Sequence, residues 1–327
     1  MKVGLFVNTQ CPAGTDMGAL VPALVEQVRT ARESGFSSLW FPQHYLTAPM
    51  LMLQQSSILP YMLAHAQGMT VGGDILILPL QNPVAVAEDA ATLDVLSGGR
   101  FVLGVGLGYR EEEFAAFGVP LSERAPRFVE SVRLIRRLWA EDTVAHEGRF
   151  FRVKGGIGAR PVRKEGIPIW IAAQADAAIR RAAELGDSWL IIPSTGMAEL
   201  DASLQVYKAA LAANGKPMPV EFPITRECYV GESQASALEE CRGPLAFKYG
   251  AYARWGLDGQ DRENPDAAFQ RMVRDCFIIG DKSYVKDQIA RYRETLGVNH
   301  FIMRLHWPGF PQERVLRSIR ALGEIFA

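Results

Sequence analysis

Hydrophobic residues recur along this chain with two different periods. Short apolar runs rich in Val, Ile, Leu and Phe alternate with segments in which apolar residues stand at i, i+3, i+4 and i+7. Val21, Leu24, Val25 and Val28 show the second spacing, which is typical of a helix with one buried face. Continuous apolar runs are typical of strands that are covered on both faces. The pattern therefore predicts alternating strands and helices.

Eight such strand-helix units can be counted. The predicted strands cover residues 3–7, 39–41, 69–78, 101–105, 167–172, 189–192, 222–230 and 300–305. The predicted helices cover residues 21–28, 51–66, 84–95, 111–117, 127–139, 177–185, a segment ending at 215, helix-compatible sequence after 230, a segment from 281 to 297, and 311–326. A small hairpin is expected over residues 143–153, and residues 256–265 are expected to be irregular.

Several of these helices carry recognisable end signals. Asn82 is expected to cap a helix whose first turn holds Pro83, and one face of this helix is expected to be lined by Val84, Ala87, Ala91 and Val95. Asp176 is expected to cap the helix of the fifth unit, and Gly186 to end it. These signals strengthen the assignment of separate units.

Eight units without a break in composition predict a single (β/α)8 barrel domain over residues 1–327, with the hairpin inserted before the fifth strand. Parallel strands need helical crossovers, and a ring of helices covers a barrel of such strands from outside. An open, doubly wound sheet is the alternative that periodicity leaves. In a barrel, catalytic groups come from the carboxyl ends of the strands.

Composition excludes several classes of function. With 327 residues, 48% of them hydrophobic, the chain can bury a full core, and a net charge of −1 without a Lys/Arg-rich run argues against a nucleic-acid partner. No run reaches the ~18 apolar residues of a membrane span, and the first residues lack the pattern of a secretory signal, so a cytoplasmic location is expected. The four cysteines form no CxxC pair and are expected to be reduced.

Few residues with chemical potential follow the predicted strands. His44 follows the second strand and the apolar Trp40-Phe41-Pro42, which would place an imidazole at the barrel mouth, where it could act as a general base. The alternative is a histidine that only bonds a loop carbonyl. Among the five histidines, only His300 and His306 have a spacing that could suggest metal ligands, and no metal site is predicted.

The glycines after the fourth strand could suggest a dinucleotide-binding loop. Gly104, Gly106 and Gly108 alternate with apolar residues, but Tyr109 occupies the position of the third glycine in that fingerprint. The strand is also the fourth in the chain, not the first. A nicotinamide site is therefore not predicted.

An ordered set of motifs resembles the luciferase-like monooxygenase family. The matching residues are Asn82-Pro83, Ala87-Glu88, Leu93 to Phe101, Leu103 to Gly108, Glu113-Phe114, Phe117-Gly118, Arg124, Glu130, Leu138-Trp139, Pro168 to Ile171, Ala182 to Trp189 and Gly280. The resemblance covers most of the chain except residues 233–275. In such families that part forms a variable lid over the substrate, so substrate identity is the least transferable property.

The resemblance implies a (β/α)8 barrel whose mouth binds reduced FMN or, alternatively, the deazaflavin coenzyme F-420. His44 would match the family's histidine after strand 2, a base or a stabiliser of the reacting flavin. The implied cofactor contacts are Phe6, Gly73, Asp74, Gly106 and Tyr109. A non-proline cis peptide is expected at Asp74-Ile75, because family members often have one there.

The loop after strand 5 departs from the family pattern. It holds no Ser or Thr for the cofactor phosphate, which would instead rest on helix N–H groups, Gln174, Ala175 and Arg124. Asp176 would repel a phosphate, which counts against this mapping.

The resemblance implies a monooxygenase that uses reduced FMN and O2 on a small organic substrate, with a separate reductase supplying the reduced flavin. Hydride transfer with coenzyme F-420 and a flavin-binding barrel without catalysis are the alternatives. It also implies a homodimer formed through residues 51–66 and 84–96.

Overall fold

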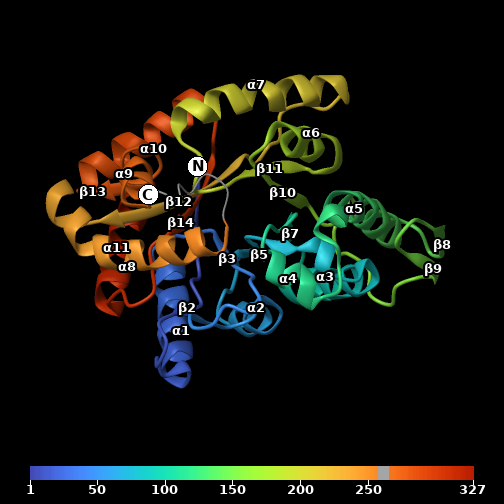
Figure 1. The fold of residues 1–327 in the computed structure, drawn as a ribbon, viewed down its shortest axis with the longest axis horizontal. Helices are drawn as coiled ribbons and strands as arrows, with labels where there is room; N and C mark the ends of the chain where they lie inside the picture. Colours follow the sequence, from blue (N-terminus) through green and yellow to red (C-terminus); the bar gives the residue numbers. More distant parts are fainter. Residues whose placement is uncertain (257–264) are drawn as a thin grey trace.

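The computed structural model describes residues 1–256 and 265–327, and its centre is a closed barrel of parallel strands (Figure 1). The barrel strands are β1 (Lys2–Phe6), β3 (Ser38–Phe41), β5 (Thr70–Gly73), β7 (Phe101–Gly106), β10 (Ile169–Ala173), β11 (Ser188–Ile191), β12 (Pro223–Val230) and β14 (His300–Arg304). Pairing of β7 with β10 closes the ring. The predicted (β/α)8 barrel is confirmed, and the open sheet is wrong.

Helices surround the barrel. They are α1 (Met17–Glu33), α2 (Gln55–Leu63), α3 (Pro83–Ser97), α5 (Arg124–Ala140), α6 (Asp176–Leu185), α7 (Met197–Ala213), α8 (Gln234–Arg254), α10 (Lys282–Leu296) and α11 (Gln312–Phe326). Two further helices, α4 (Glu111–Ala116) and α9 (Pro265–Asp275), lie in the loops after β7 and β12. The expected irregular stretch falls mostly on residues 257–264, outside the described residues.

Several short strands lie outside the eight barrel strands. The expected hairpin is present as β8 (Val144–Glu147) and β9 (Arg152–Gly155), which pair antiparallel and extend from α5 at one edge of the molecule (Figure 1). β2 (Gln10–Cys11) pairs with β4 (Leu51–Met52), and β13 (Ile278–Gly280) pairs with β12. Neither pairing was expected from the sequence, because strands of two or three residues carry no usable period.

Three sequence assignments need correction. The third strand is not continuous over residues 69–78: β5 ends at Gly73, a cis peptide joins Asp74 to Ile75, and β6 (Leu76–Ile77) and the 3₁₀ turn η1 (Leu78–Leu80) follow. The helix expected over residues 51–66 begins at Gln55, because residues 51–52 pair with β2. Asp176 is the first helical residue of α6, and Ala175 holds the cap position.

The buried face of α3 also differs from the expected one. Asn82 caps α3 as predicted, accepting from the Val84 N–H at 2.9 Å. Val95, however, is 51% exposed, and Asp94 is fully buried in its place. Asp94 accepts from the Val162 N–H and pairs with Arg163 at 3.0 Å, so its burial is compensated. The outer face of α3 is correspondingly apolar.

Side chains from six of the eight barrel strands fill the barrel interior. The layer consists of Phe6, Trp40, Val102, Trp170, Leu190 and Ile302. The rings of Trp40 and Trp170 stack with their centroids 4.7 Å apart. Because this layer closes the middle of the barrel, small molecules can enter only at its ends, and the site lies at the mouth.

Candidate functional site

A cavity of about 300 Å³ opens at the carboxyl ends of the strands. Seven of the nine site residues expected from the sequence line it: His44, Asp74, Gly106, Tyr109, Arg124, Gln174 and Ala175. They lie at the end of, or after, four different strands of the barrel, so only the closed fold brings them together.

The other two expected residues do not line the cavity. Phe6 is 2% exposed and lies under the guanidinium of Arg304, whose Cζ is 4.2 Å from the ring centroid. Gly73 faces β7, where an added Cβ would lie 3.2 Å from the carbonyl oxygen of Gly104. Gly73 therefore permits close strand packing, and Phe6 supports a cavity residue.

A histidine and a glutamate form a pair at the mouth. His44 Nδ1 lies 3.0 Å from Oε1 of Glu113, and Glu113 is fully buried. The same carboxylate oxygen accepts from the Tyr45 backbone N–H at 2.8 Å and lies 3.3 Å from Arg110 Nη1. A carboxylate held on Nδ1 fixes the imidazole so that Nε2 remains for chemistry.

Aromatic rings surround the imidazole. The rings of Tyr109, Tyr252 and Trp255 lie 5.9, 6.0 and 5.3 Å from that of His44. The guanidinium of Arg110 stacks on Trp255 at 4.2 Å. These rings restrict water around His44, which strengthens the electrostatic interactions of the pair.

The opposite end of the cavity is cationic. Arg124, the first residue of α5, lines the cavity near Ala175 and Ala178 at the start of α6. Burial lowers the pKa of Arg181 on α6, and the nearby charge of Arg124 lowers it further against the opposing effect of Glu184. The guanidinium of Arg124 beside the N-terminus of α6 is a donor set suited to a phosphate.

Asp176, which counted against a phosphate here, points its charge elsewhere. Its side chain is 65% exposed, and its carboxylate lies 3.6 Å from Arg180. The repulsion expected from the sequence is therefore partly offset by a neighbouring cation and by solvent.

A second group of charges lies deeper in the mouth. Asp74 accepts from the Thr225 hydroxyl at 2.8 Å, and Arg304 Nη1 lies 3.4 Å from Glu227 Oε1. Glu227 also pairs with Lys248 of α8. Thus α8, in the segment expected to form a lid, contributes buried polar groups to the site.

Sequence reasoning missed Glu113, Tyr252 and Arg304. A signal existed for Arg304: the side chains of β14 alternate, and Ile302 faces the barrel interior, so Arg304 must follow it on the same face at the mouth. Glu113 lies on a short helix, and Tyr252 lies on α8 in the part of the chain without family motifs. For these two, the sequence carried no sign of which way the side chain points.

The residues present fit a phosphorylated ring cofactor. Ile75, Leu107 and Ile192 supply apolar wall, and the arginine end supplies anion donors. Arg304 lines the cavity, and its Nε is a buried donor without a hydrogen-bond partner among the described residues. Flat apolar walls with a cationic end match a ring system that carries a phosphate chain.

The two histidines whose spacing could suggest metal ligands, His300 and His306, lie in different surroundings. Within residues 1–256 and 265–327, no three His, Cys, Asp or Glu side chains are placed to share a metal ion, and no helix has the length and apolar character needed to span a bilayer. His300 is buried against Ser38 and Glu221 at the start of β14, while His306 contacts Gln27. The two histidines therefore do not share a site.

Comparison with known proteins agrees with this geometry. Residues 1–300 match the family model described as luciferase-like monooxygenase. This chain belongs to the luciferase-like monooxygenase family. It is therefore an oxidoreductase enzyme, as the resemblance of its motifs implied.

Three proteins illustrate the range of the luciferase-like family around this chain. An F420-dependent glucose-6-phosphate dehydrogenase of Amycolatopsis mediterranei is 28% identical over 92% of this chain and 95% of the relative. Monooxygenase RslO1 of Streptomyces bottropensis has a TM-score of 0.87 at 23% identity, with 99% and 98% of the two chains covered. The oxygenating constituent of 3,6-diketocamphane monooxygenase of Pseudomonas putida, in complex with FMN, has a TM-score of 0.80 at 16% identity, with 99% and 97% covered. The two solved structures support the barrel fold.

Proposed function

We propose that this enzyme is a monooxygenase that uses reduced FMN and O2 to oxygenate a small organic substrate. The observation that carries the proposal is the cavity itself: His44, held by the buried Glu113, stands in its wall, and Arg124 lines it together with the start of α6. The flavin supplies the redox chemistry when bound, and the protein supplies binding, orientation and proton transfer.

Arg124 and the N-terminus of α6 would hold the phosphate. Ile75, Leu107 and Ile192 would flank the ring system with apolar surface. Asp74, at the mouth end of β5, would provide a polar contact. This assignment agrees with a cavity that has one polar end and apolar walls, because such a cavity fixes the orientation of an asymmetric ligand.

His44 would act as the general base or acid. Its Nδ1 is held by Glu113, so Nε2 is the atom that can accept a substrate proton. The buried carboxylate stabilises the imidazolium that forms when the proton arrives. The surrounding rings of Tyr109, Tyr252 and Trp255 keep water from competing for that proton.

Hydride transfer with coenzyme F-420 is the second candidate, and the 28% identical F420-dependent relative favours it. Anaerobic titration with oxidised and reduced FMN and with F-420 separates the two. We expect reduced FMN to bind with micromolar-class affinity and oxidised FMN to bind more weakly, because spent flavin must leave for re-reduction. Binding of F-420 without detectable binding of either FMN form would contradict the monooxygenase proposal.

A separate reductase would supply the reduced flavin. The loop after β1 reads Val7-Asn8-Thr9-Gln10 and has no glycine fingerprint for a nicotinamide cofactor. We therefore expect no sustained NADH or NADPH oxidation at saturating FMN until a flavin reductase is added. The measurement is the decay of nicotinamide absorbance, and sustained turnover by the protein alone would refute a two-component system.

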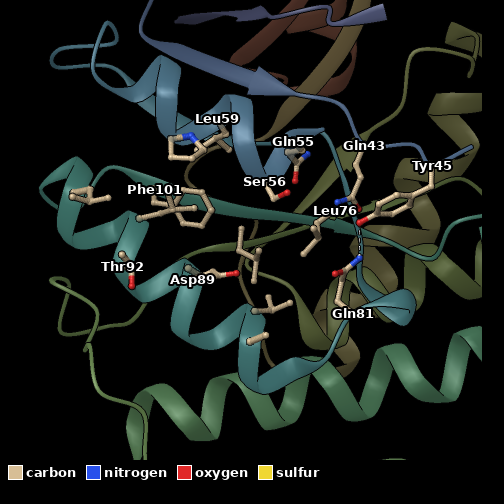
Figure 2. A pocket seen from close by; sticks show the side chains of 17 residues that line it. Gln43, Tyr45, Gln55, Ser56, Leu59, Leu76, Gln81, Asp89, Thr92 and Phe101 are labelled. Carbon is tan, nitrogen blue, oxygen red and sulfur yellow. Dashed lines mark hydrogen bonds between the residues drawn. The ribbon is translucent and has the colours of Figure 1, made fainter. Parts of the chain in front are cut away.

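A homodimer through α2 and α3 is part of the proposal. Between these helices lies a groove of about 300 Å³ whose apolar lining includes Leu59, Leu93 and Leu96; Figure 2 shows Leu59 and Phe101 across from Thr92 and Asp89. Leu96 of α3 is 63% exposed, and Tyr61 of α2 is 52% exposed. Exposed apolar side chains on helices that flank a groove are typical of protein interfaces.

Light scattering tests this assembly. The wild-type protein should have the mass of a dimer, and Leu96→Asp should have that of a monomer because it buries a charge in the interface. Val220→Asp is the control, since Val220 is 91% exposed and outside the groove. A monomeric wild-type protein would refute the dimer.

A further inference from the structure

The charged group deeper in the mouth, Asp74, Glu227, Lys248 and Arg304, has an uneven distribution of charge that plays no part in the proposed chemistry. Glu227 is fully buried on β12 and is surrounded by donors: Lys248 Nζ at 2.5 Å, the Tyr249 hydroxyl at 2.8 Å, the Trp307 indole N–H, and Arg304 Nη1 at 3.4 Å. Two cations therefore share one carboxylate. A single carboxylate so enclosed cannot neutralise both.

The second carboxylate of the group compensates only in part. Burial raises the pKa of Asp74, although the charge of Arg304 opposes the rise. Burial would raise the pKa of Glu227 as well, but Lys248 and Arg304 hold it below its ordinary value. Burial and the repulsion of Arg304 lower the pKa of Lys248 to about 7. The lowered pKa values of Glu227 and Lys248 are what neighbouring positive charge produces, whereas the raised pKa of Asp74 follows from its burial.

Arg304 is the cation of this group that lines the cavity. It is 6% exposed, its guanidinium lies on the ring of Phe6, and its Nη2 is 3.5 Å from the Tyr252 hydroxyl. Its Nε has no partner among the described residues, and the residue is part of the cavity wall. A buried charged donor without an acceptor is costly, so an acceptor from a ligand would relieve it.

We propose that Arg304, backed by Lys248, is an anion-binding element of the cavity that accepts the delocalised oxyanion edge of a flat conjugated ring. A planar guanidinium matches an edge of alternating oxygen and nitrogen atoms better than a point charge does. The inference rests on the proposed function, which places such a ring in this cavity. Two sources share the chemistry: the negatively charged pyrimidine edge of a reduced flavin or deazaflavin, and the phenolate or enolate of a substrate.

The first arm of the test measures the cofactor. Dissociation constants for reduced and oxidised FMN, or F-420 if that is what binds, are compared anaerobically, together with the reduction potential of the bound cofactor. We expect Arg304→Met to reduce the preference for the reduced form at least tenfold, which corresponds to about 30 mV for a two-electron couple. Lys248→Met should shift the preference in the same direction by a smaller factor, because Lys248 does not line the cavity.

The second arm measures a phenolate. The probe is 4-nitrophenol, whose ionised form absorbs in the visible range. If Arg304 binds the phenolate of a substrate, the wild-type cavity binds 4-nitrophenol as its anion, and Arg304→Met removes this preference for the anion. A change confined to the first arm assigns the site to the cofactor, and a change confined to the second assigns it to the substrate.

Controls separate the possible failures. Arg226→Met removes another buried guanidinium, one that bonds Tyr292 and the carbonyls of Ile192 and Thr195 and does not line the cavity. It should leave both preferences unchanged. Circular dichroism shows whether each variant folds. If Arg304→Met does not fold, Lys248→Met tests the proposal in its place, because Glu227 keeps its other donors in that variant.

The proposal is overturned if the wild-type protein binds its cofactor but neither variant changes the preference for reduced cofactor or for phenolate. If neither FMN nor F-420 binds the wild-type protein, the proposed function fails instead, and the nitrophenol arm alone still decides the role of Arg304.

Discussion

Replacing Glu113 by Gln tests how the His44–Glu113 pair works. All three donors to this carboxylate, the His44 imidazole, the Tyr45 N–H and Arg110, meet at Oε1, and Oε2 has no partner among the described residues. A Gln carbonyl oxygen can occupy the position of Oε1 and keep these contacts. The substitution therefore removes the negative charge with little change in geometry.

The expected loss follows from the contacts. Unit charges about 4 Å apart interact by about 4 kcal/mol at an effective dielectric constant of 20. The positive charge of Arg110, 3.3 Å from the same oxygen, cancels part of the stabilisation that Glu113 gives an imidazolium at His44. We expect turnover to fall about 10- to 100-fold, which corresponds to about 1.4 to 2.7 kcal/mol of transition-state stabilisation.

Stability should change moderately. Arg110 loses its counter-charge, but it still donates to the carbonyls of Tyr45 and Leu46 and stacks on Trp255. We expect the free energy of unfolding to fall by about 1 to 3 kcal/mol, the range for a hydrogen bond to a charged group. Cofactor affinity should remain near that of the wild-type protein, because Glu113 does not line the cavity.

The assay is single-turnover oxidation with reduced flavin, measured beside flavin binding and thermal unfolding. Glu130→Gln is a matched control: Glu130 of α5 lies 3.1 Å from His146 Nε2 and accepts from the Phe150 and Phe151 N–H groups of the hairpin, but it does not line the cavity. It should lower stability and leave turnover within about twofold. A Glu113→Gln protein that reacts at the wild-type rate would show that the carboxylate only supports the fold.

Three further predictions concern other parts of the molecule. Arg124→Met should weaken binding of reduced FMN about tenfold or more while leaving riboflavin, which lacks the phosphate, unaffected in the same titration; equal weakening of both would remove Arg124 from the phosphate site. The hydrogen bond with His300 lowers the pKa of Glu221 to about 2 against the effect of burial, so the ionised Glu221 stabilises the fold above the unfolded-state pKa of about 4.5, and this contribution is lost as pH falls through 2. Glu221→Gln should therefore flatten the acid side of a curve of unfolding free energy against pH, measured by denaturant unfolding. An unchanged slope would contradict this. Gly104→Ala should destabilise the barrel by more than about 3 kcal/mol or prevent soluble expression, because its Cβ would lie 1.8 Å from the Gly73 carbonyl oxygen; near-wild-type thermal unfolding would show that β5 and β7 can separate there.

The sequence by itself determined the order of the barrel. Strand and helix periods differ, and the signals at Asn82, Gly186 and Gly297 mark helix ends locally, so eight units could be counted without a structure. His44 was found by the same logic, because in a barrel the residues after a strand lie at the mouth. The motifs also identified the family and placed the expected cis peptide at Asp74-Ile75.

Only the tertiary structure decided which side chains meet. Glu113 lies 69 positions from His44, and Lys248 of α8 pairs with Glu227 of β12 across the mouth; no local period contains such distances. Tertiary contacts also explain why Asp94, and not Val95, lies on the buried face of α3. Arg163 and the Val162 N–H compensate the charge of Asp94, which the local pattern assigns to solvent. Periodicity reports whether a position is buried on average, whereas the chemistry of this site depends on partners brought together by closing the barrel.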